Sequence, residues 1–382
     1  MNVIVLSHLR WNFVFQRPQH LMTRCARKNR VFFWEEPIFD AESSFLEVRK
    51  TEFNIRVIVP HLPKGLSSRQ VSRVQECLLA GLMQQYRIED YILWYYTPMA
   101  LDFTQHLQPQ AVVYDCMDEL SAFRGAPPGL RAAESALFAQ ADLVFTGGRS
   151  LYKIKKFQHR SVHCFPSSID SDFFGRARRE RVMPMDQAGI PGPRLGYCGV
   201  IDERMDSDLL VRVADLRPHW QIIMIGPIVK VNWSELPYRL NIHYLGAKEY
   251  RSLPSYFAGW DVGLLPFARN ESTRFISPTK TPEYLAAGLP VVSTPIADVM
   301  DPYGVKSLVE IANTPEEFVT SVEFAMASRN HATRLAKVDQ FLSQVSWDLT
   351  WEGMNRLIED VRTSRVPVGD KLTAVSDTAA AD

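Results

Sequence analysis

Several signatures that identify common enzyme classes are missing from this sequence of 382 residues. No GxGxxG segment opens a helix after the first apolar run, and no GxxxxGK[ST] segment occurs, which argues against a dinucleotide dehydrogenase and a P-loop NTPase. The five cysteines are scattered and include no CxxC pair, so neither a disulfide framework nor a zinc site is predicted. A reducing cytoplasm is the compartment that fits this cysteine usage.

Long apolar runs and an excess of charge are missing as well. No run approaches the roughly 20 apolar residues of a membrane-spanning helix, and residues 1–9 are typical of a buried strand rather than a signal peptide. The formal net charge is zero, but residues 1–193 carry a net +5 and residues 194–382 a net −5. This asymmetry supports two units with different partners and is too small to indicate nucleic-acid binding.

What the chain does contain is a repeated alternation of short apolar runs with helical patterns. Continuous apolar runs bounded by turn residues favour strands that are buried on both faces of a parallel sheet, and the alternation favours repeated βαβ units. The runs form two series: 3–6, 31–34, 55–59, 91–95, 111–114 and 143–146, then 195–200, 221–225, 242–245, 262–265, 291–293 and 308–311. The prediction is an α/β protein with two Rossmann-like, doubly wound domains.

The domain boundaries follow from changes in composition. The stretch 176–193 is polar, basic and rich in Pro and Gly, so it is predicted to link a first domain, 1–175, to a second, 194–346. Residues 347–362 form one further helix pattern, with Trp347, Trp351, Met354 and Leu357 on one side. The tail, 363–382, is low in aromatic residues and is predicted to be disordered.

The most informative segment is 276–294, ISPTKTPEYLAAGLPVVST. It predicts a short helix capped by Ser277 or Thr281, a glycine stop at Gly288 and a buried strand after it. A helix that begins here would direct N–H groups at a phosphate, and Lys280 adds a full positive charge. Glu283 lies one turn further on, where a carboxylate can accept hydrogen bonds from sugar hydroxyls. The alternative is a surface helix with an ordinary lysine and an ordinary glutamate.

Further candidates follow other apolar runs, at the edge where open α/β sheets bind ligands. Arg10 and Arg17 lie in the loop after the first run and are predicted to line a cleft or bind an acceptor. Gly199 ends the first run of the second series, where the missing side chain would let a phosphate approach, and Arg204 would reach the same anion with its guanidinium.

Acidic residues form two kinds of pattern. The segment 114–119, YDCMDE, places three carboxylates after a buried run and predicts a catalytic or substrate-orienting group among them, the alternative being helix-start acids. The two DxD segments, 170–172 and 206–208, do not follow a strand closely. We therefore predict that they are turn and helix-cap aspartates, with no metal site.

Taken together, four segments resemble the GT-B glycosyltransferases, and in particular the retaining glycosyltransferase family 4. They are 141–151 (ADLVFTGGRSL), 164–174 (CFPSSIDSDFF), 195–204 (LGYCGVIDER) and 276–294, in the order in which that family has them. The start, 15–21 (FQRPQHL), is similar to a bacterial subgroup linked to exopolysaccharide and teichuronic-acid assembly. The resemblance implies two facing Rossmann-like domains, with the last helix crossing back to the first. It also implies transfer of a sugar from a nucleotide-diphosphate sugar to a hydroxyl acceptor with retention, without a metal or other cofactor.

The resemblance also implies roles for individual residues. Glu283 matches the second glutamate of the family's E-x7-E motif, which holds the ribose, but Phe275 stands at the first. Main-chain amides near Ile276 and Ser277, or the carboxylate of Glu271, are expected to replace the missing glutamate. Arg204 and Lys280 are then the catalytic cations, Asp118 takes the place of the family's N-domain histidine, and the donor site is completed by Gly199, Ser277 and Glu283.

Two rival functions and two partners stay open at this point. The rivals are a sugar-nucleotide epimerase on the same fold and a catalytically degenerate protein that binds a glycan or a partner enzyme. The expected acceptor is a glycan or a lipid-linked glycan, met by a cytoplasmic enzyme at an anionic membrane surface. Two stretches without acidic residues, 1–30 and 143–169, motivate this expectation, against the alternative that both are solvated helix faces. The second stretch includes Lys153, Lys155, Lys156 and Phe157.

Overall fold

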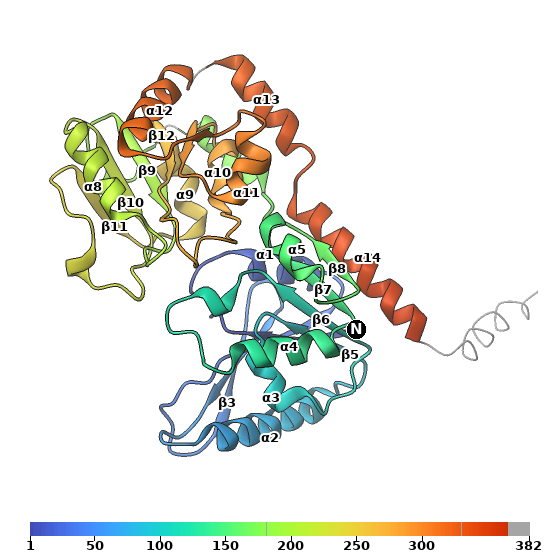
Figure 1. Ribbon diagram of the computed structural model, residues 1–382. Coiled ribbons are helices and arrows are strands. Elements are labelled where there is room, and N and C mark those ends of the chain that lie inside the picture. The colour runs from blue at the N-terminus through green and yellow to red at the C-terminus, as the bar shows by residue number, and fades with distance from the viewer. Residues whose placement is uncertain (181, 330, 366–382) are drawn as a thin grey trace, which may run out of the picture.

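The computed structural model describes residues 1–180, 182–329 and 331–365. Within these residues the chain forms two sheets with helices on both faces, one parallel and one parallel except for a single antiparallel edge strand, and the two resulting domains lie against each other (Figure 1). The predicted fold class is therefore confirmed. The chain passes from the first sheet to the second between Cys164 and Arg194, so the predicted linker, 176–193, lies within that passage.

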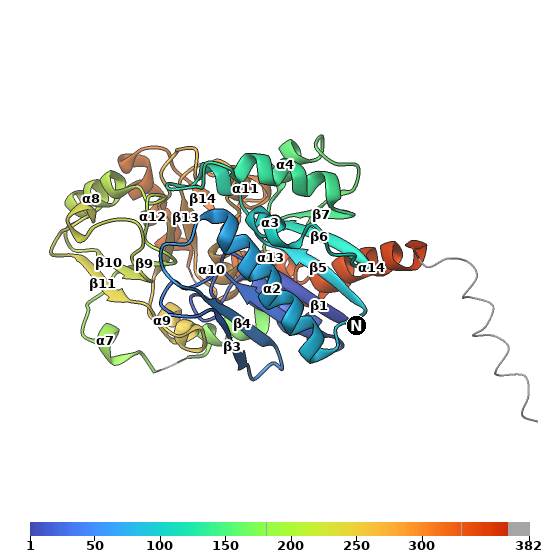
Figure 2. The same ribbon diagram turned by 90° about the horizontal axis from the view of Figure 1, so that it is seen from below.

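The N-terminal domain is built on a sheet with the strand order β3-β4-β2-β1-β5-β6-β7-β8. Its strands are β1 (Asn2–Ser7), β2 (Arg30–Glu35), β3 (Phe45–Lys50), β4 (Arg56–His61), β5 (Tyr91–Tyr95), β6 (Ala111–Cys116), β7 (Leu143–Thr146) and β8 (Val162–Cys164). Its helices include α1 (Arg17–Cys25), α2 (Ser68–Tyr86), α3 (Leu101–Thr104), α4 (Leu130–Gln140) and α5 (Arg149–Lys155). Figure 2 shows α2 crossing in front of this sheet, where Leu79 and Leu82 join the buried core.

All six strands that the sequence predicts for this domain are present, but two strands were missed. β3 is an exposed edge strand that pairs antiparallel with β4, so it lacks the continuous apolar run that identifies the buried strands. β8 has three residues, Val162, His163 and Cys164, which are only partly buried.

The C-terminal domain has the strand order β11-β10-β9-β12-β13-β14. Its strands are β9 (Arg194–Cys198), β10 (Gln221–Ile225), β11 (Ile242–Gly246), β12 (Val262–Leu265), β13 (Val291–Ser293) and β14 (Glu310–Ile311). Its helices include α8 (Ser207–Leu216), α9 (Leu253–Ala258), α10 (Lys280–Ala286), α11 (Ala297–Val299), α12 (Pro315–Ser328) and α13 (Ala332–Leu342). Each of the six predicted runs of the second series contributes a strand.

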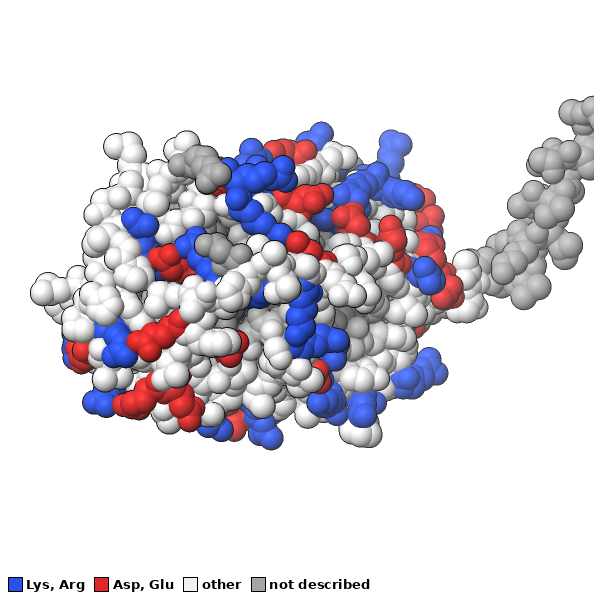
Figure 3. All heavy atoms as spheres, turned by 90° about the horizontal axis from the view of Figure 1, so that it is seen from above, with Lys and Arg blue, Asp and Glu red and all other residues white. Residues whose placement is uncertain are grey.

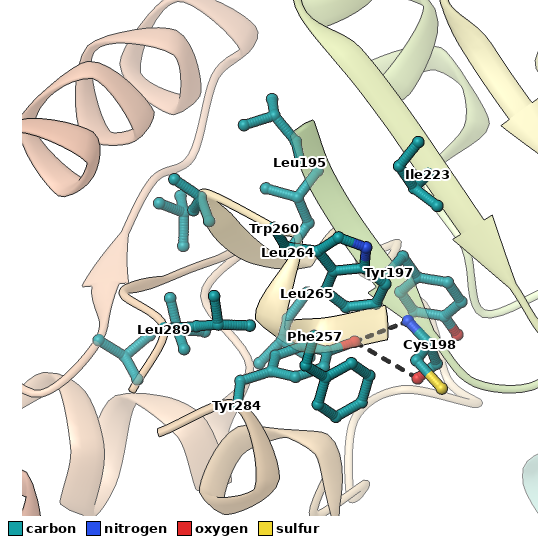
Figure 4. Packing of buried hydrophobic residues seen from close by; sticks show 14 of the residues in the cluster. Leu195, Tyr197, Cys198, Ile223, Phe257, Trp260, Leu264, Leu265, Tyr284 and Leu289 are labelled. Carbon is teal, nitrogen blue, oxygen red and sulfur yellow. Dashed lines mark hydrogen bonds between the residues drawn. The ribbon is translucent and has the colours of Figure 1, made fainter. Parts of the chain in front are cut away.

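Close packing fixes α10 against β9 and β12. The ring of Tyr284 lies over Gly263, where an added Cβ would be only 2.6 Å from the ring, and Trp260 lies over Gly196 in the same way. Figure 4 shows Tyr284 and Trp260 among the buried side chains of this core, with dashed lines between Tyr284 and Cys198. The Tyr284 hydroxyl accepts a 2.6 Å hydrogen bond from the backbone N–H of Cys198. The helix that carries Lys280 and Glu283 is thereby held at the carboxyl end of the first strand of this domain.

Within residues 1–365 the described chain crosses between the domains twice. The passage after β8 includes α6 (Ser171–Gly175), and α14 (Trp347–Arg365) returns to the N-terminal domain, where Trp347, Met354 and Ile358 are buried in its core. The predicted helix over 347–362 thus forms and continues to Arg365, while the rest of the predicted disordered tail, 366–382, lies outside the described residues. Aromatic pairs pack at both crossings: Tyr250 stacks on Phe173 at 4.7 Å, and His20 stacks on Trp347 at 4.6 Å.

Candidate active site

The carboxyl-terminal edges of the two sheets meet between the domains. Asp298, which lies after β13, accepts 2.8 Å hydrogen bonds from the backbone N–H groups of Arg149 and Ser150 at the start of α5. The Ser167 hydroxyl donates to the carbonyl of Ser277 across the same boundary. These contacts place the segments after β7 and β8 opposite those after β12 and β13, as a ligand bound between two doubly wound domains requires.

Arg204 lies in the loop after β9 and is held in one orientation. Its Nε and Nη2 donate to the two carboxylate oxygens of Asp202 at 2.9 and 2.7 Å. Burial alone would lower the pKa of Arg204, but the hydrogen bonds and charge of Asp202 raise it. Its Nη1 has no hydrogen-bond partner in the part of the chain that the structure describes, so this edge of the guanidinium remains available to an anion.

Lys280 and Glu283 are brought together, as predicted, but in direct contact with each other. The Lys280 ammonium pairs with the Glu283 carboxylate, and both side chains are almost fully buried. Burial raises the pKa of Glu283, and the adjacent Lys280 offsets part of that rise. A ligand that reaches this pair meets a buried cation and a buried acceptor side by side.

The predicted cap of this helix is wrong. α10 begins at Lys280, one residue after Thr279, so neither Ser277 nor Thr281 caps it, and no side chain accepts a hydrogen bond there. The Thr281 amide donates instead to the carbonyl of Pro278, which closes a turn ahead of the helix. With seven residues the helix is short, and the phosphate-binding helix start predicted at Ser277 is not formed. The glycine stop is confirmed, because Gly288 has φ +85°.

The three carboxylates at the end of β6, where Asp115 lies within the strand and Asp118 and Glu119 follow it, have separate environments. Asp115 forms a buried ion pair with Arg17 at 2.8 Å, and Glu119 pairs with Lys155, also at 2.8 Å. The Asp118 carboxylate has no hydrogen-bond partner among the described residues and lies near Arg204. Desolvation raises the pKa of Asp118 to about 6, and Arg204 and Arg17 offset part of this rise. Of the three, Asp118 is the carboxylate left for a ligand.

The two arginines predicted for the acceptor cleft do not share one role. The Arg17 guanidinium is 2% exposed and donates to Asp115 and to the carbonyl of Phe165, so the prediction that it meets an acceptor is wrong. It ties α1 to β6 and to the chain after β8. Arg10 is partly exposed and pairs with Glu35 at 3.1 Å, beside a cavity of about 410 Å³ in the N-terminal domain.

The structure gives Gly199 a packing role. An added Cβ would lie 2.9 Å from the Tyr197 hydroxyl, and the carbonyl of Gly199 lies against Gly226. Its N–H donates to the carbonyl of Ile225, so this amide is already occupied.

The surroundings of Phe275 show which of the groups expected to replace the missing glutamate lie in position to do so. Phe275 packs against the core of the N-terminal domain, so an apolar contact between the domains stands where the resemblance implies a carboxylate. Glu271 is exposed and lies 3.7 Å from Arg274, so the expectation that it reaches into the site is wrong. The Ile276 amide donates to Thr273, whereas the Ser277 amide has no partner in the described chain.

Sequence reasoning missed His8, which directly follows β1 at the cleft. Its Nδ1 lies 3.1 Å from the Tyr96 carbonyl, so the neutral ring donates from Nδ1 and keeps the Nε2 lone pair free. Burial lowers the pKa of His8 to about 4. Its position after an apolar strand was the available signal. Phe123 was also missed, because its contacts are with the other domain and leave no local pattern.

Three comparisons with known proteins agree with this architecture. Residues 204–352 match the family described as "Glycosyl transferase-like". The structure aligns with a sucrose-phosphate synthase from Thermosynechococcus elongatus at a TM-score of 0.74, with 13% identity, over 95% of this chain and 99% of that one. The chain has the GT-B fold. WaaG, "a glycosyltransferase involved in lipopolysaccharide biosynthesis", aligns at a TM-score of 0.65, with 15% identity, over 93% of this chain and 99% of that one.

A sequence relative adds a more specific likeness. The chain is 26% identical over 262 residues to the "Putative teichuronic acid biosynthesis glycosyltransferase TuaH" of Bacillus subtilis. The match covers 63% of this chain and 65% of that protein, just under two thirds of its length. The described residues contain no helix that is long and apolar enough to cross a membrane.

Proposed function

We propose that this protein is a glycosyltransferase that moves a sugar from a nucleotide-diphosphate sugar to a hydroxyl acceptor in the assembly of a bacterial cell-surface polysaccharide. The observation that carries the proposal is Arg204, which Asp202 orients with one guanidinium edge free at the cleft of a GT-B fold. The likeness to TuaH supports polysaccharide assembly as the setting. Five free cysteines are in keeping with the cytoplasm as the compartment.

The main task of the site is to stabilise the departing diphosphate. Arg204 and Lys280 supply two positive charges in a partly buried cleft, where an ion pair is stronger than in water. Glu283 accepts hydrogen bonds from the ribose and lowers the energy of keeping Lys280 charged. These groups act without a metal, so transfer should persist in EDTA.

Asp118 is the group that we assign to the acceptor side. Its carboxylate comes from the N-terminal domain, has no partner among the described residues and lies near Arg204. We infer that it orients the acceptor hydroxyl or another hydroxyl next to the reacting carbon. Transfer of a hexosyl group with retention is proposed on the resemblance to family 4, and NMR of the product's anomeric centre tests it.

The acceptor is proposed to be a glycan, free or lipid-linked, that the enzyme meets at an anionic membrane. In the structure fewer of the basic side chains that motivated this idea are available to a membrane, since Lys155 is buried and Arg24 and Arg27 pair with Asp348. Figure 3, which looks down on the side of the molecule where α12 and α13 lie, shows Lys and Arg side chains interspersed with Asp and Glu. What remains is a patch in the last turn of α5 and just after it, in which Phe157 is 82% exposed. Its other members are Lys153, Lys156 and Arg160, all exposed.

Sedimentation with anionic vesicles tests the membrane part of the proposal. Replacing Lys153, Lys156 and Arg160 with Gln should release the protein from the vesicles at low salt, because each basic residue contributes about 1 kcal/mol near such a surface. The matched control replaces Lys64, Arg69 and Arg73, which are exposed at the start of α2 and just before it. Equal binding of both triple variants would refute the role of the patch.

A screen of nucleotide sugars tests the function itself. A donor present at 100 times its dissociation constant should stabilise the protein by about 2.7 kcal/mol, which a thermal shift detects. The donor so found is then tested for transfer to glycan acceptors. If a donor binds but is neither transferred nor hydrolysed, the proposal of an enzyme is wrong and the degenerate binding protein is favoured.

A further inference from the structure

The loop between β6 and α4, residues 117–129, belongs to the N-terminal domain but docks on the C-terminal one. The backbone N–H of Arg124 donates to Glu203 at 3.2 Å, and the Lys230 ammonium donates to the carbonyl of Arg124 at 3.0 Å. Asn270 in turn donates to the carbonyl of Glu203. Two loops of the C-terminal domain therefore hold this segment by its main chain.

Phe123 is the side chain at the centre of this contact. The Arg204 guanidinium lies 5.5 Å from the centre of its ring and the Lys230 ammonium 5.7 Å, both within the range of a cation–π interaction. The ring is half-buried. Lys230 holds a left-handed backbone conformation with φ 60°, which residues other than glycine adopt rarely. The same loop carries Asp118, so one segment brings an aromatic ring and a carboxylate to Arg204.

Arg204 is thus restrained from two directions that differ in origin. Asp202 belongs to the same domain and accompanies Arg204 in any domain motion. Phe123 belongs to the other domain and withdraws if the cleft opens. The free guanidinium edge is therefore restrained by both Asp202 and Phe123 only when the domains are closed.

We propose that Phe123 is a positioning residue that couples domain closure to the hold on the departing diphosphate. This inference rests on the proposed function, since it needs Arg204 to bind a diphosphate. If closure strengthens that hold, then by thermodynamic reciprocity the diphosphate also strengthens closure. Closure over the ring also keeps water from the reacting carbon, which favours transfer over hydrolysis.

Hydrogen exchange of the whole chain, with UDP, ADP or GDP as the probe, tests the coupling without a need for catalysis. A nucleotide that binds should slow exchange of the amides at 199–206 in one domain and at 119–126 in the other. In Phe123→Ala the first effect should persist and the second should be lost. Slowing at 199–206 without slowing at 119–126 in the wild type, or slowing of both in Phe123→Ala, overturns the inference. If no probe slows 199–206, the proposed function fails and this inference falls with it.

A second measurement uses the donor identified by the screen. In Phe123→Ala the ratio of donor hydrolysis to transfer should rise about tenfold, which is about 1.4 kcal/mol. Phe123→Trp, which keeps an aromatic face, should stay within about twofold of the wild type. Phe324→Ala removes an exposed phenylalanine of α12 that belongs to no site proposed above and is the matched control. A wild-type ratio in Phe123→Ala, or an equal rise in Phe324→Ala, contradicts the assignment.

Discussion

Replacing Asp118 with Asn should make the protein more stable and less active. Desolvation raises the pKa of this carboxyl from 3.8 to about 6, and Asp202 and Asp115 add to the rise. A group whose pKa is raised by folding stabilises the native state below its unfolded pKa, near 4, and loses that contribution as the pH rises through 6. The wild type therefore carries a penalty above pH 6 that Asn does not.

The size of the penalty follows from the shift. About two pKa units at 1.36 kcal/mol each give close to 3 kcal/mol as an upper limit. Urea unfolding of Asp118→Asn and the wild type at pH 8 and pH 4 should show a gain approaching this figure at pH 8 and a much smaller gain at pH 4. Asp208→Asn, which removes an exposed carboxylate on α8, is the control.

Activity should move in the opposite direction. Wild-type transfer is expected to fall below pH 6 as Asp118 takes up a proton, and this limb of the pH profile should disappear in Asp118→Asn together with most of the turnover. The reasoning is refuted if Asp118→Asn is no more stable than the wild type at pH 8 and keeps the same acid limb. Those two results together would mean that the carboxylate is neither desolvated nor required.

Three further predictions concern the cleft. Lys280→Ala should lower turnover and also destabilise the protein by about 3–5 kcal/mol, because it leaves Glu283 buried without its cation. Adding Glu283→Gln to this variant should restore stability but not turnover. Wild-type turnover in Lys280→Ala would exclude a role for Lys280 in transfer. Glu283→Gln should weaken, in titration calorimetry, the binding of every sugar carried on one nucleotide; a loss for a single sugar would assign Glu283 to the sugar instead. Gly148→Ala should loosen the contact between the domains, since the new Cβ would lie 2.2 Å from Asp298, and small-angle scattering should then show a larger radius of gyration; unchanged scattering and stability would contradict this.

The sequence predicts much of the framework because the signals involved are local. A strand buried on both faces needs a continuous apolar run, and each of the twelve predicted runs contributes a strand. Helix caps are equally local: Asp170 and Asp206 each accept a hydrogen bond from the backbone N–H three residues on, as predicted for both DxD segments. Gly288 is a third example, since a left-handed helix stop favours glycine whatever surrounds it.

The site was harder to predict because its contacts join distant parts of the chain. Arg17 and Asp115 are 98 residues apart, and nothing near either one indicates that they neutralise each other in the interior. The sequence places Lys155 in a basic stretch expected at the surface, but its ammonium is buried and forms ion pairs with Glu119 and Glu134. Asp118 is selected on the resemblance alone, and the structure adds the physical distinction that its two neighbours, Asp115 and Glu119, are paired. Residue type alone does not show whether a charged side chain is paired in the interior or available to a ligand, because that depends on the partners that the fold brings to it.

The return of α14 to the N-terminal domain has a mechanical consequence. In the part of the chain that the structure describes, two segments rather than one cross between the domains, one after β8 and one ahead of Trp347. Two such attachments define a line, and the motion that stretches neither segment is rotation about that line. Opening is thereby reduced from a free reorientation to a single angular coordinate. Any group that lies far from the line, such as the loop that carries Phe123, then travels furthest for a given rotation and senses the angle most sensitively.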